Sequence, residues 1–317
     1  MKVLITEEIR EEGINQLQAQ HLEVQYAPNL WQDKETLQDK MKDVDALIVR
    51  NQTQVDEALL NESRHLKVIG RLGVGLDNIN VEKAKEKGIK VVVPRHANAT
   101  SVAEYVMATI LNANRPIHLA DEDVRQGNWN RAKHTGAEIF QTTIGLIGLG
   151  EIAHRVAKRA KAFGMEVIGY DPFMTEHDHI IAESGVQRKK SLEEVLADSD
   201  FISIHVPLTP STKHLVSQAQ FTTMKPSAYV INSSRGGIID EDALYHALKN
   251  HEIAGAYLDV LEREPIDISD KLLALENVTF TPHIAGLTSE SQIRISTLVT
   301  QEVAKLLKGD PSLCVVN

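Results

Sequence analysis

The chain has 317 residues, of which 42% are hydrophobic and 25% charged, so we expect two domains with cores of ordinary size. Its formal net charge is −10, and an acidic chain without a run of Lys or Arg is unsuited to nucleic acid or to an anionic membrane surface. A single cysteine, Cys314, excludes a disulfide framework and a cysteine-ligated metal site. We therefore expect a cytoplasmic protein with no bound metal and no membrane anchor.

Short apolar runs alternate with longer amphipathic segments along the chain. The runs are brief and rich in β-branched residues, which is typical of strands buried on both faces of a parallel sheet. This alternation predicts an α/β protein with two doubly wound parallel sheets. The predicted strands cover residues 3–5, 46–49, 67–70, 90–93, 143–147, 167–170, 201–204, 229–231 and 256–258.

Two long helical segments, over 101–126 and 288–307, interrupt this alternation. The second ends just before Gly309 and Pro311, residues that commonly stop a helix. Because long helices at such places can connect domains, we place one domain at 1–97 and a second at 98–286. Residues 287–317 would return to the first domain.

A glycine-rich turn, Gly-x-Gly-x-x-Ala over 148–153, joins a predicted strand to a predicted helix. Gly148 permits the tight turn, Gly150 lets a pyrophosphate approach the backbone, and Ala153 allows close helix–strand packing. The N–H groups at the start of the helix would bind the phosphates. Asp171 lies 21 residues after Gly150, where an acidic residue binds the ribose hydroxyls of NAD and repels the 2′-phosphate of NADP. The turn therefore predicts an NAD site.

Three charged residues follow predicted strands of the same domain: Arg235, Glu264 and His283. Reduction of a 2-keto acid needs a planar cation for the carboxylate and carbonyl, a proton donor, and a carboxylate that orients the donor. Arg235, His283 and Glu264 could supply these in turn. Each residue also has an ordinary interpretation when it is taken alone. Arg235 and Glu264 could form a salt bridge, and His283 could be a structural histidine.

Eight segments together resemble the D-isomer-specific 2-hydroxyacid dehydrogenase family. Besides the turn at 148–153 they are RLGVGLDNI at 71–79, SVAE at 101–104, GNW at 127–129, HVPL at 205–208, NSSRGGIID at 232–240, DVLEREP at 259–265 and PHIAG at 282–286. The resemblance implies hydride transfer between NAD and a small 2-hydroxy or 2-keto acid. It also implies a Rossmann NAD domain, 98–286, inserted in a flavodoxin-like substrate domain, 1–97 plus 287–317, and a homodimer built around the helix that begins near Ser101.

The resemblance assigns roles to individual residues. It makes Arg235, Glu264 and His283 the catalytic residues and places Asp259 at the nicotinamide carboxamide. The other cofactor-binding residues would be Gly148, Gly150, Glu151, Ile152, Asp171, Val206, Thr212, Ser233, Ser234 and Gly286. The substrate-binding residues would be Arg50, Asn51, Arg71, Gly73, Val74 and Gly75, the last three through N–H groups that face the substrate carboxylate.

The segment 50–55 is similar to the one that phosphoglycerate dehydrogenases use near the anionic tail of their substrate. We therefore expect 3-phosphoglycerate/3-phosphohydroxypyruvate as the substrate pair, with a role in serine biosynthesis. Sulfolactate is the next alternative, and glyoxylate or hydroxypyruvate the third. Because the sequence ends at 317, we expect no C-terminal regulatory domain and no feedback by serine through one.

Proteins of another class share the same three charged residues. The C-terminal-binding proteins resemble this family but act as NADH-sensing corepressors, so the triad does not discriminate between the two functions. Those proteins carry extensions beyond the core, which favours an enzyme here. Formate and phosphite dehydrogenases share the fold as well, although the plain N-terminus argues against the former.

Overall fold

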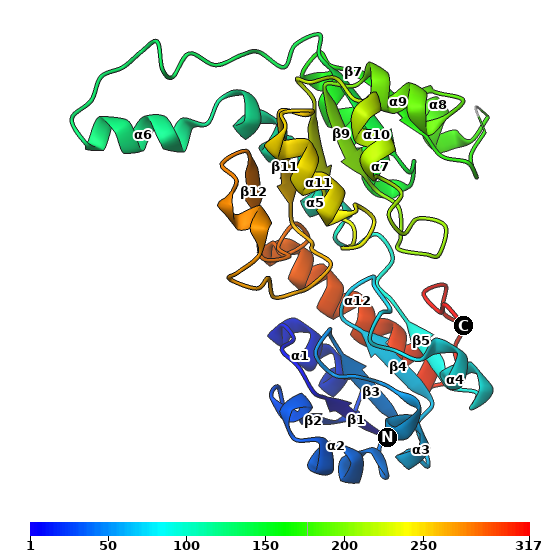
Figure 1. Cartoon of the computed structure of the whole chain (residues 1–317). Helices are drawn as coiled ribbons and strands as arrows, with labels where there is room; N and C mark the ends of the chain where they lie inside the picture. The colour runs from blue at the N-terminus through cyan, green and yellow to red at the C-terminus, as the bar shows by residue number, and fades with distance from the viewer. Residues whose placement is uncertain (176) are drawn as a thin grey trace. The chain divides into compact units, whose positions relative to one another are not determined.

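The computed structural model describes residues 1–175 and 177–317. Contacts within it divide the chain into two compact units (Figure 1). Unit 1 comprises Met1–Asn98 and Leu287–Asn317, and unit 2 comprises Ala99–Gly286. Within the described part of the chain, no helix combines the length and the apolar character needed to cross a membrane.

Unit 1 contains a five-stranded parallel sheet with the order β2-β1-β3-β4-β5. This is the flavodoxin-like order of a doubly wound sheet. The central strands are buried on both faces; every residue of β3, for example, is inaccessible to solvent. The strands are β1 (Lys2–Ile5), β2 (Glu23–Tyr26), β3 (Ala46–Val49), β4 (Val68–Arg71) and β5 (Lys90–Val92).

The C-terminal helix α12 (Ser289–Leu307) packs on α1 (Glu11–Ala19) and on β4 of unit 1. Its contact with the sheet depends on Gly70, because a Cβ there would overlap the side chains of Val299 and Val303. The other helices of unit 1 are α2 (Lys34–Met41), α3 (Glu57–Glu62) and α4 (Val81–Glu86), and a short 3₁₀ turn, η1, covers Leu30–Gln32. Each of these three helices begins with a side chain that accepts a hydrogen bond from the first turn.

Unit 2 contains a seven-stranded parallel sheet with the order β12-β11-β10-β9-β6-β7-β8. This is the Rossmann order, in which the chain reverses its direction of progress between β6 and β9. Ligands of such sheets bind at the carboxyl ends of the strands near that reversal. The strands are β6 (Thr143–Ile147), β7 (Glu166–Tyr170), β8 (Gln187–Arg188), β9 (Phe201–Ile204), β10 (Tyr229–Asn232), β11 (Gly255–Leu258) and β12 (Val278–Phe280).

Helices cover both faces of this sheet, and two apolar clusters fill the space between. Adjacent residues of one strand belong to different clusters; in β10, Val230 packs in one and Ile231 in the other. Because both faces of the strand are buried, its residues are apolar at successive positions. The helices are α5 (Ala99–Asn114), α6 (Ile117–Arg125), α7 (Glu151–Ala162), α8 (His179–Ser184), α9 (Leu192–Asp198), α10 (Gln218–Thr223) and α11 (Glu241–Lys249), with a 3₁₀ turn, η2, at Lys271–Ala274.

The single helix predicted over 101–126 is wrong. The structure has two helices there, α5 and α6, separated at Arg115 and Pro116. Proline has no N–H to donate and disfavours helical geometry in the residue before it, so the helix ends at this point. In Figure 1, α6 lies away from the sheet of unit 2, at the far end of a long connecting segment.

Candidate active site

The glycine-rich turn follows β6, beside the point where the strand order reverses. Gly148 has φ +87°, and a Cβ there would lie 2.8 Å from the carbonyl oxygen of His205, so both conformation and space require glycine. A Cβ on Gly150 would meet no atom of the described residues within 4 Å. Gly150 is also the N-cap of α7 and has no side chain to cap the first N–H groups of this 12-residue helix, so these groups are left for a ligand. The turn therefore fits a pyrophosphate.

Asp171 follows β7 and is held by the same turn. Its Oδ2 accepts a hydrogen bond from the Leu149 N–H at 3.0 Å, and its Oδ1 accepts one from the Phe173 N–H at 2.9 Å. These bonds fix a carboxylate one strand away from the expected phosphate position. Such a group can accept hydrogen bonds from ribose hydroxyls and repels a 2′-phosphate.

Ser233, just after β10, has a buried hydroxyl without a hydrogen-bond partner among the described residues. The neighbouring Ser234 differs, since its hydroxyl donates to the carbonyl of Ile204 at 2.6 Å. A buried polar atom without a partner is costly, so the Ser233 hydroxyl fits the edge of a site that a polar ligand completes.

The other residues predicted at the cofactor lie around the same edge of the sheet. Thr212 lies in the segment after β9 and donates its hydroxyl to the carbonyl of Pro207 at 2.6 Å. The carboxylate of Glu151, at the start of α7, pairs with Arg155. Three residues remain. Val206 follows β9, Ile152 lies in the first turn of α7, and Gly286 lies at the end of the turn after β12.

Arg235 lies in a tight turn that its own neighbours stabilise. The side chain of Asn232 donates to the Arg235 carbonyl at 2.9 Å and accepts from the Ser234 N–H at 3.1 Å. The next residue, Gly236, packs so closely on the turn after β11 that a Cβ would overlap the Leu261 carbonyl. Glycine at this position therefore lets the segments that carry Arg235 and Glu264 approach each other.

Glu264 and His283 form a hydrogen-bonded pair, with 2.8 Å between Oε2 and Nδ1. The other oxygen of Glu264 accepts from the Leu261 N–H at 3.1 Å. Burial alone would raise the pKa of Glu264, but the hydrogen bond and charge of His283, the Leu261 N–H and the charge of Arg235 together lower it. The carboxylate is therefore ionised at neutral pH and accepts the hydrogen bond from the imidazole. With Nδ1 engaged, Nε2 is the ring atom left for proton transfer.

The turn that carries His283 is tied to a buried carboxylate. Asp259 is 2% exposed and accepts from the Thr281 hydroxyl at 2.6 Å, the Ile284 N–H at 2.7 Å and the Ala285 N–H at 2.8 Å. Since Thr281 donates to Asp259, the hydroxyl of Tyr105 in α5 donates to Thr281, at 2.7 Å. Burial, partly offset by this bond, raises the pKa of Tyr105 to about 12. Contact between Asp259 and a nicotinamide stays a prediction, and within the protein its carboxylate fixes the histidine turn.

His205 sits beside Gly148, and its imidazole bonds the hydroxyl of Ser203 at 2.9 Å through Nε2. Burial lowers the pKa of His205 to about 4, so the ring is neutral. A buried neutral ring is compatible with a structural role, and its Nδ1 has no hydrogen-bond partner among the described residues. Sequence reasoning missed Tyr105 and Thr281, because neither residue type signals a function without its neighbours in space.

The residues predicted at the substrate gather at one edge of the sheet of unit 1. Val49 and Arg71 are register partners at the ends of β3 and β4, so the main chain at Arg50 lies next to the end of β4. The guanidinium of Arg71 folds over Gly73, where a Cβ would overlap it. The N–H of Gly73 donates to the Arg71 carbonyl at 2.9 Å, so it is already engaged within the protein. Exposed side chains at the same edge belong to Asn51 and Val74, and Gly75 is buried.

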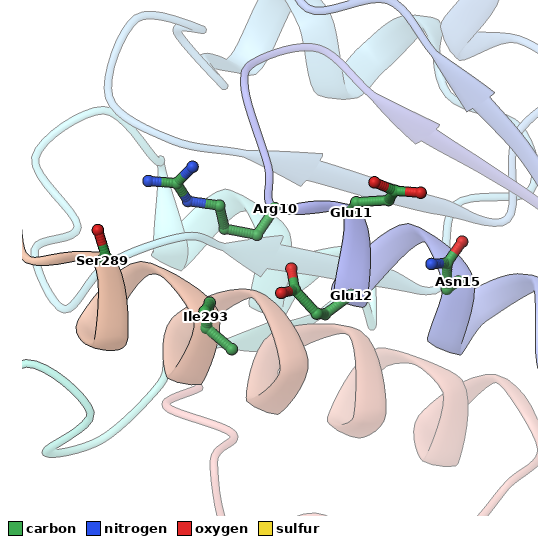
Figure 2. Close-up of a pocket in the computed structure, with 6 residues that line it drawn as sticks. All are labelled: Arg10, Glu11, Glu12, Asn15, Ser289 and Ile293. Carbon is green, nitrogen blue, oxygen red and sulfur yellow. The ribbon is translucent and has the colours of Figure 1, made fainter.

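A cavity of about 510 Å³ in unit 1 lies elsewhere, where the first turns of α1 and α12 meet (Figure 2). Figure 2 shows its six lining residues, Arg10, Glu11, Glu12, Asn15, Ser289 and Ile293. The set combines one cation with two carboxylates and contains none of the residues predicted at the substrate or the cofactor. We therefore locate the candidate site at the strand ends and not in this cavity.

The Rossmann strand order, the glycine turn and the carboxylate after β7 together define a dinucleotide-binding protein. Residues 107–285 match the model of the NAD-binding domain of D-isomer-specific 2-hydroxyacid dehydrogenases. The chain belongs to this family.

Relatives of known name differ in the acid that their names specify. The chain is 44% identical over 318 residues to a D-3-phosphoglycerate dehydrogenase of Methanocaldococcus jannaschii, covering 100% of this chain and 59% of that one. It is 40% identical over 305 residues to an (S)-sulfolactate dehydrogenase of Chromohalobacter salexigens, covering 96% and 98%. The crystal structure of a glyoxylate reductase from Paecilomyes thermophila superposes with a TM-score of 0.87 at 27% identity, covering 100% and 98%.

Proposed function

We propose that the protein is an NAD-dependent D-2-hydroxyacid dehydrogenase that acts on 3-phosphoglycerate/3-phosphohydroxypyruvate. The observation that carries the activity is the pair of Glu264 and His283, 2.8 Å apart, with Arg235 close enough to lower the pKa of Glu264. A guanidinium, an imidazole and a carboxylate of this kind match the needs of keto-acid reduction. The NAD-binding domain to which they belong supports the choice of cofactor.

The proposed mechanism assigns one task to each residue. NADH, when bound, supplies the hydride that reduces the carbonyl carbon. The guanidinium of Arg235 binds the carboxylate and carbonyl oxygen of the substrate and stabilises negative charge on that oxygen. His283 donates the proton from Nε2 to the same oxygen, and Glu264 keeps the imidazole oriented and its cationic form stable. In the oxidative direction, His283 accepts the proton.

An acid with an anionic tail is favoured by the cations of unit 1, to which we assign substrate binding. Arg50 follows β3 and Arg71 ends the neighbouring strand β4, and the guanidinium group of each suits a phosphate. The identity of 44% with a phosphoglycerate dehydrogenase supports the same choice, and with it a place in serine biosynthesis. Sulfolactate is the second candidate because its sulfonate presents a similar anion. Glyoxylate is the third.

The substrate is tested by measuring NADH oxidation with phosphohydroxypyruvate, sulfopyruvate and glyoxylate. We expect the highest kcat/KM with phosphohydroxypyruvate. Arg50→Ala should lower that value by about 10–100-fold and leave glyoxylate nearly unaffected, because a hydrogen bond to a charged group contributes about 1.5–3 kcal/mol. Arg64→Ala, at an exposed arginine of the same unit, is the control and should change neither.

A clear preference for glyoxylate would contradict the proposal that the substrate has an anionic tail. NADH binding with negligible turnover of all three acids would instead favour the corepressor-like function.

The preference for NAD over NADP is tested at Asp171. Asp171→Asn removes the charge and keeps the size, and it should raise the ratio of kcat/KM for NADPH to that for NADH by about tenfold or more, since placing like charges together costs upward of about 1.4 kcal/mol. Glu166→Gln removes the same charge from the exposed start of β7 and should leave the ratio unchanged. An unaltered ratio in Asp171→Asn would show that this carboxylate does not face the ribose.

We further propose a homodimer that uses α5 and α6, located in the cytoplasm. Apolar side chains on α6 are open to solvent, with Ile117 75%, Leu119 47% and Val124 48% exposed. Grouped apolar exposure of this kind marks an interaction surface, and a second copy of the chain would cover it. The free thiol of Cys314 is compatible with a reducing compartment.

A further inference from the structure

We propose that Glu7 is a positioning residue for the anionic tail of the substrate: its buried carboxylate binds the main chain of residues 50–53 and so fixes where Arg50 presents its guanidinium. This inference rests on the proposed function, which assigns the tail to Arg50. Neither the reaction mechanism nor the cofactor site uses Glu7.

The carboxylate of Glu7 accepts four hydrogen bonds from four consecutive N–H groups. Oε1 accepts from Arg50 at 2.8 Å and from Thr53 at 3.0 Å, and Oε2 accepts from Asn51 at 3.1 Å and from Gln52 at 2.9 Å. Glu7 is 3% exposed, so these bonds replace the water that the carboxylate loses on folding. The loop is therefore folded around this one side chain.

The sheet explains why Glu7 reaches this loop. Strands β1 and β3 are neighbours, with Ile5 opposite Ile48, so the residue two positions after β1 faces the segment that follows β3. The loop is secured from its other side by Asn78, whose side chain donates to the carbonyls of Arg50 at 3.3 Å and Thr53 at 2.7 Å. Both faces of the loop backbone are thus engaged.

Successive N–H groups that point to one centre form an anion-binding concavity. In this loop the concavity is filled by a carboxylate of the protein itself, so its N–H groups are not available to a phosphate or sulfonate. The tail of the substrate must then be met by side chains, of which Arg50 is the cation on this loop. Recognition of the tail by one directed guanidinium requires that the backbone beneath it be fixed, and the Glu7 carboxylate fixes it.

Glu7 also acts on Arg50 through charge. Burial lowers the pKa of the Arg50 guanidinium, and the charges of the Glu7 and Glu8 carboxylates partly offset this effect by raising it. Two acidic residues thus lie near the same cation, but only Glu7 takes part in the four hydrogen bonds, since Glu8 is exposed. This difference provides a matched pair of variants.

Glu7→Gln tests the inference by hydrogen exchange and by kinetics. A glutamine amide has one acceptor oxygen, and its NH₂ group is a donor that faces two of the four N–H groups. We expect the amides of residues 50–53 to exchange about tenfold faster or more, and KM for phosphohydroxypyruvate to rise by about tenfold. The kcat with that substrate and both parameters with glyoxylate should change by less than about threefold, because the reacting groups are untouched.

Glu8→Gln is the control, because it removes the same charge near Arg50 and none of the four bonds. It should leave exchange and KM as in the wild type. Glu7→Asp keeps the charge on a shorter side chain and should give intermediate exchange rates for residues 50–53 and an intermediate KM. It replaces Glu7→Gln in both measurements if that variant does not fold.

The inference is overturned if Glu7→Gln exchanges at the wild-type rate, or if Glu8→Gln raises KM as much as Glu7→Gln does, since the effect would then be one of charge alone. Exchange is measured without substrate. A wild-type enzyme that prefers glyoxylate would therefore contradict the proposed substrate, whereas unchanged exchange in Glu7→Gln would contradict the role of Glu7.

Discussion

Replacing His283 with asparagine should lower kcat for keto-acid reduction by about 10²–10⁴-fold, the usual contribution of a positioned acid or base. Asparagine cannot supply a proton, while its volume and its tolerance of left-handed backbone suit the φ of +55° at this residue. The affinity for NADH, followed by fluorescence, should stay within about threefold of the wild type. Loss of the chemical step without loss of the cofactor would identify a proton donor.

His251→Asn is the matched control. His251 is an exposed histidine of the same unit with the same φ of +55°, but it lies away from the strand ends that carry the site. Its replacement should leave kcat unchanged. If His283→Asn retained more than about a tenth of the activity, another group would be the acid.

Replacing Arg235 with alanine should lower kcat/KM by about 30-fold or more, since loss of one partner of a buried charged hydrogen bond costs about 2–5 kcal/mol. Arg235→Lys should recover only part of this loss, because an ammonium restores the charge but cannot bind a carboxylate and a carbonyl through two parallel N–H groups. Asn232 bonds the main chain of Arg235 and should still hold the turn, although the bond from the guanidinium to the Ser234 carbonyl at 2.6 Å would be lost.

Arg263→Ala serves as the control for charge. This arginine is 78% exposed, lies next to Glu264 in sequence and pairs with Asp267. Its replacement should change kcat/KM by less than about twofold. Equal losses in Arg235→Ala and Arg263→Ala would indicate a general effect of charge at this loop. They would exclude specific binding of the substrate by the Arg235 guanidinium.

Most of the fold could be predicted from the pattern of apolar residues. All nine predicted strands are confirmed, as is the long C-terminal helix α12. The three strands for which no range was predicted, β2, β8 and β12, all lie at sheet edges. An edge strand is only partly buried, as the half-exposed β2 shows, so it lacks the continuous apolar run that reveals a central strand.

The site was predictable only in part. The turn at Gly148 has a local signal, because its chemistry depends on adjacent residues. The pairing of Glu264 with His283 depends on two turns after different strands. Their places after strands and the needs of the reaction suggested the pair, and the resemblance to a family made it specific. Glu7 carried no signal at all, since its role arises from a loop 43 to 46 residues away in the chain. Local patterns reveal residues whose partners are near in sequence.

The three residues to which we assign the chemistry follow β10, β11 and β12, which are consecutive in the chain and adjacent in one sheet. The residues assigned to the tail of the acid belong wholly to the other unit. Mutation can therefore alter the preferred acid through Arg50 and its supports while proton transfer is conserved. Divergence of this kind would produce enzymes of one stereochemistry and one cofactor that differ in a single substituent of the substrate.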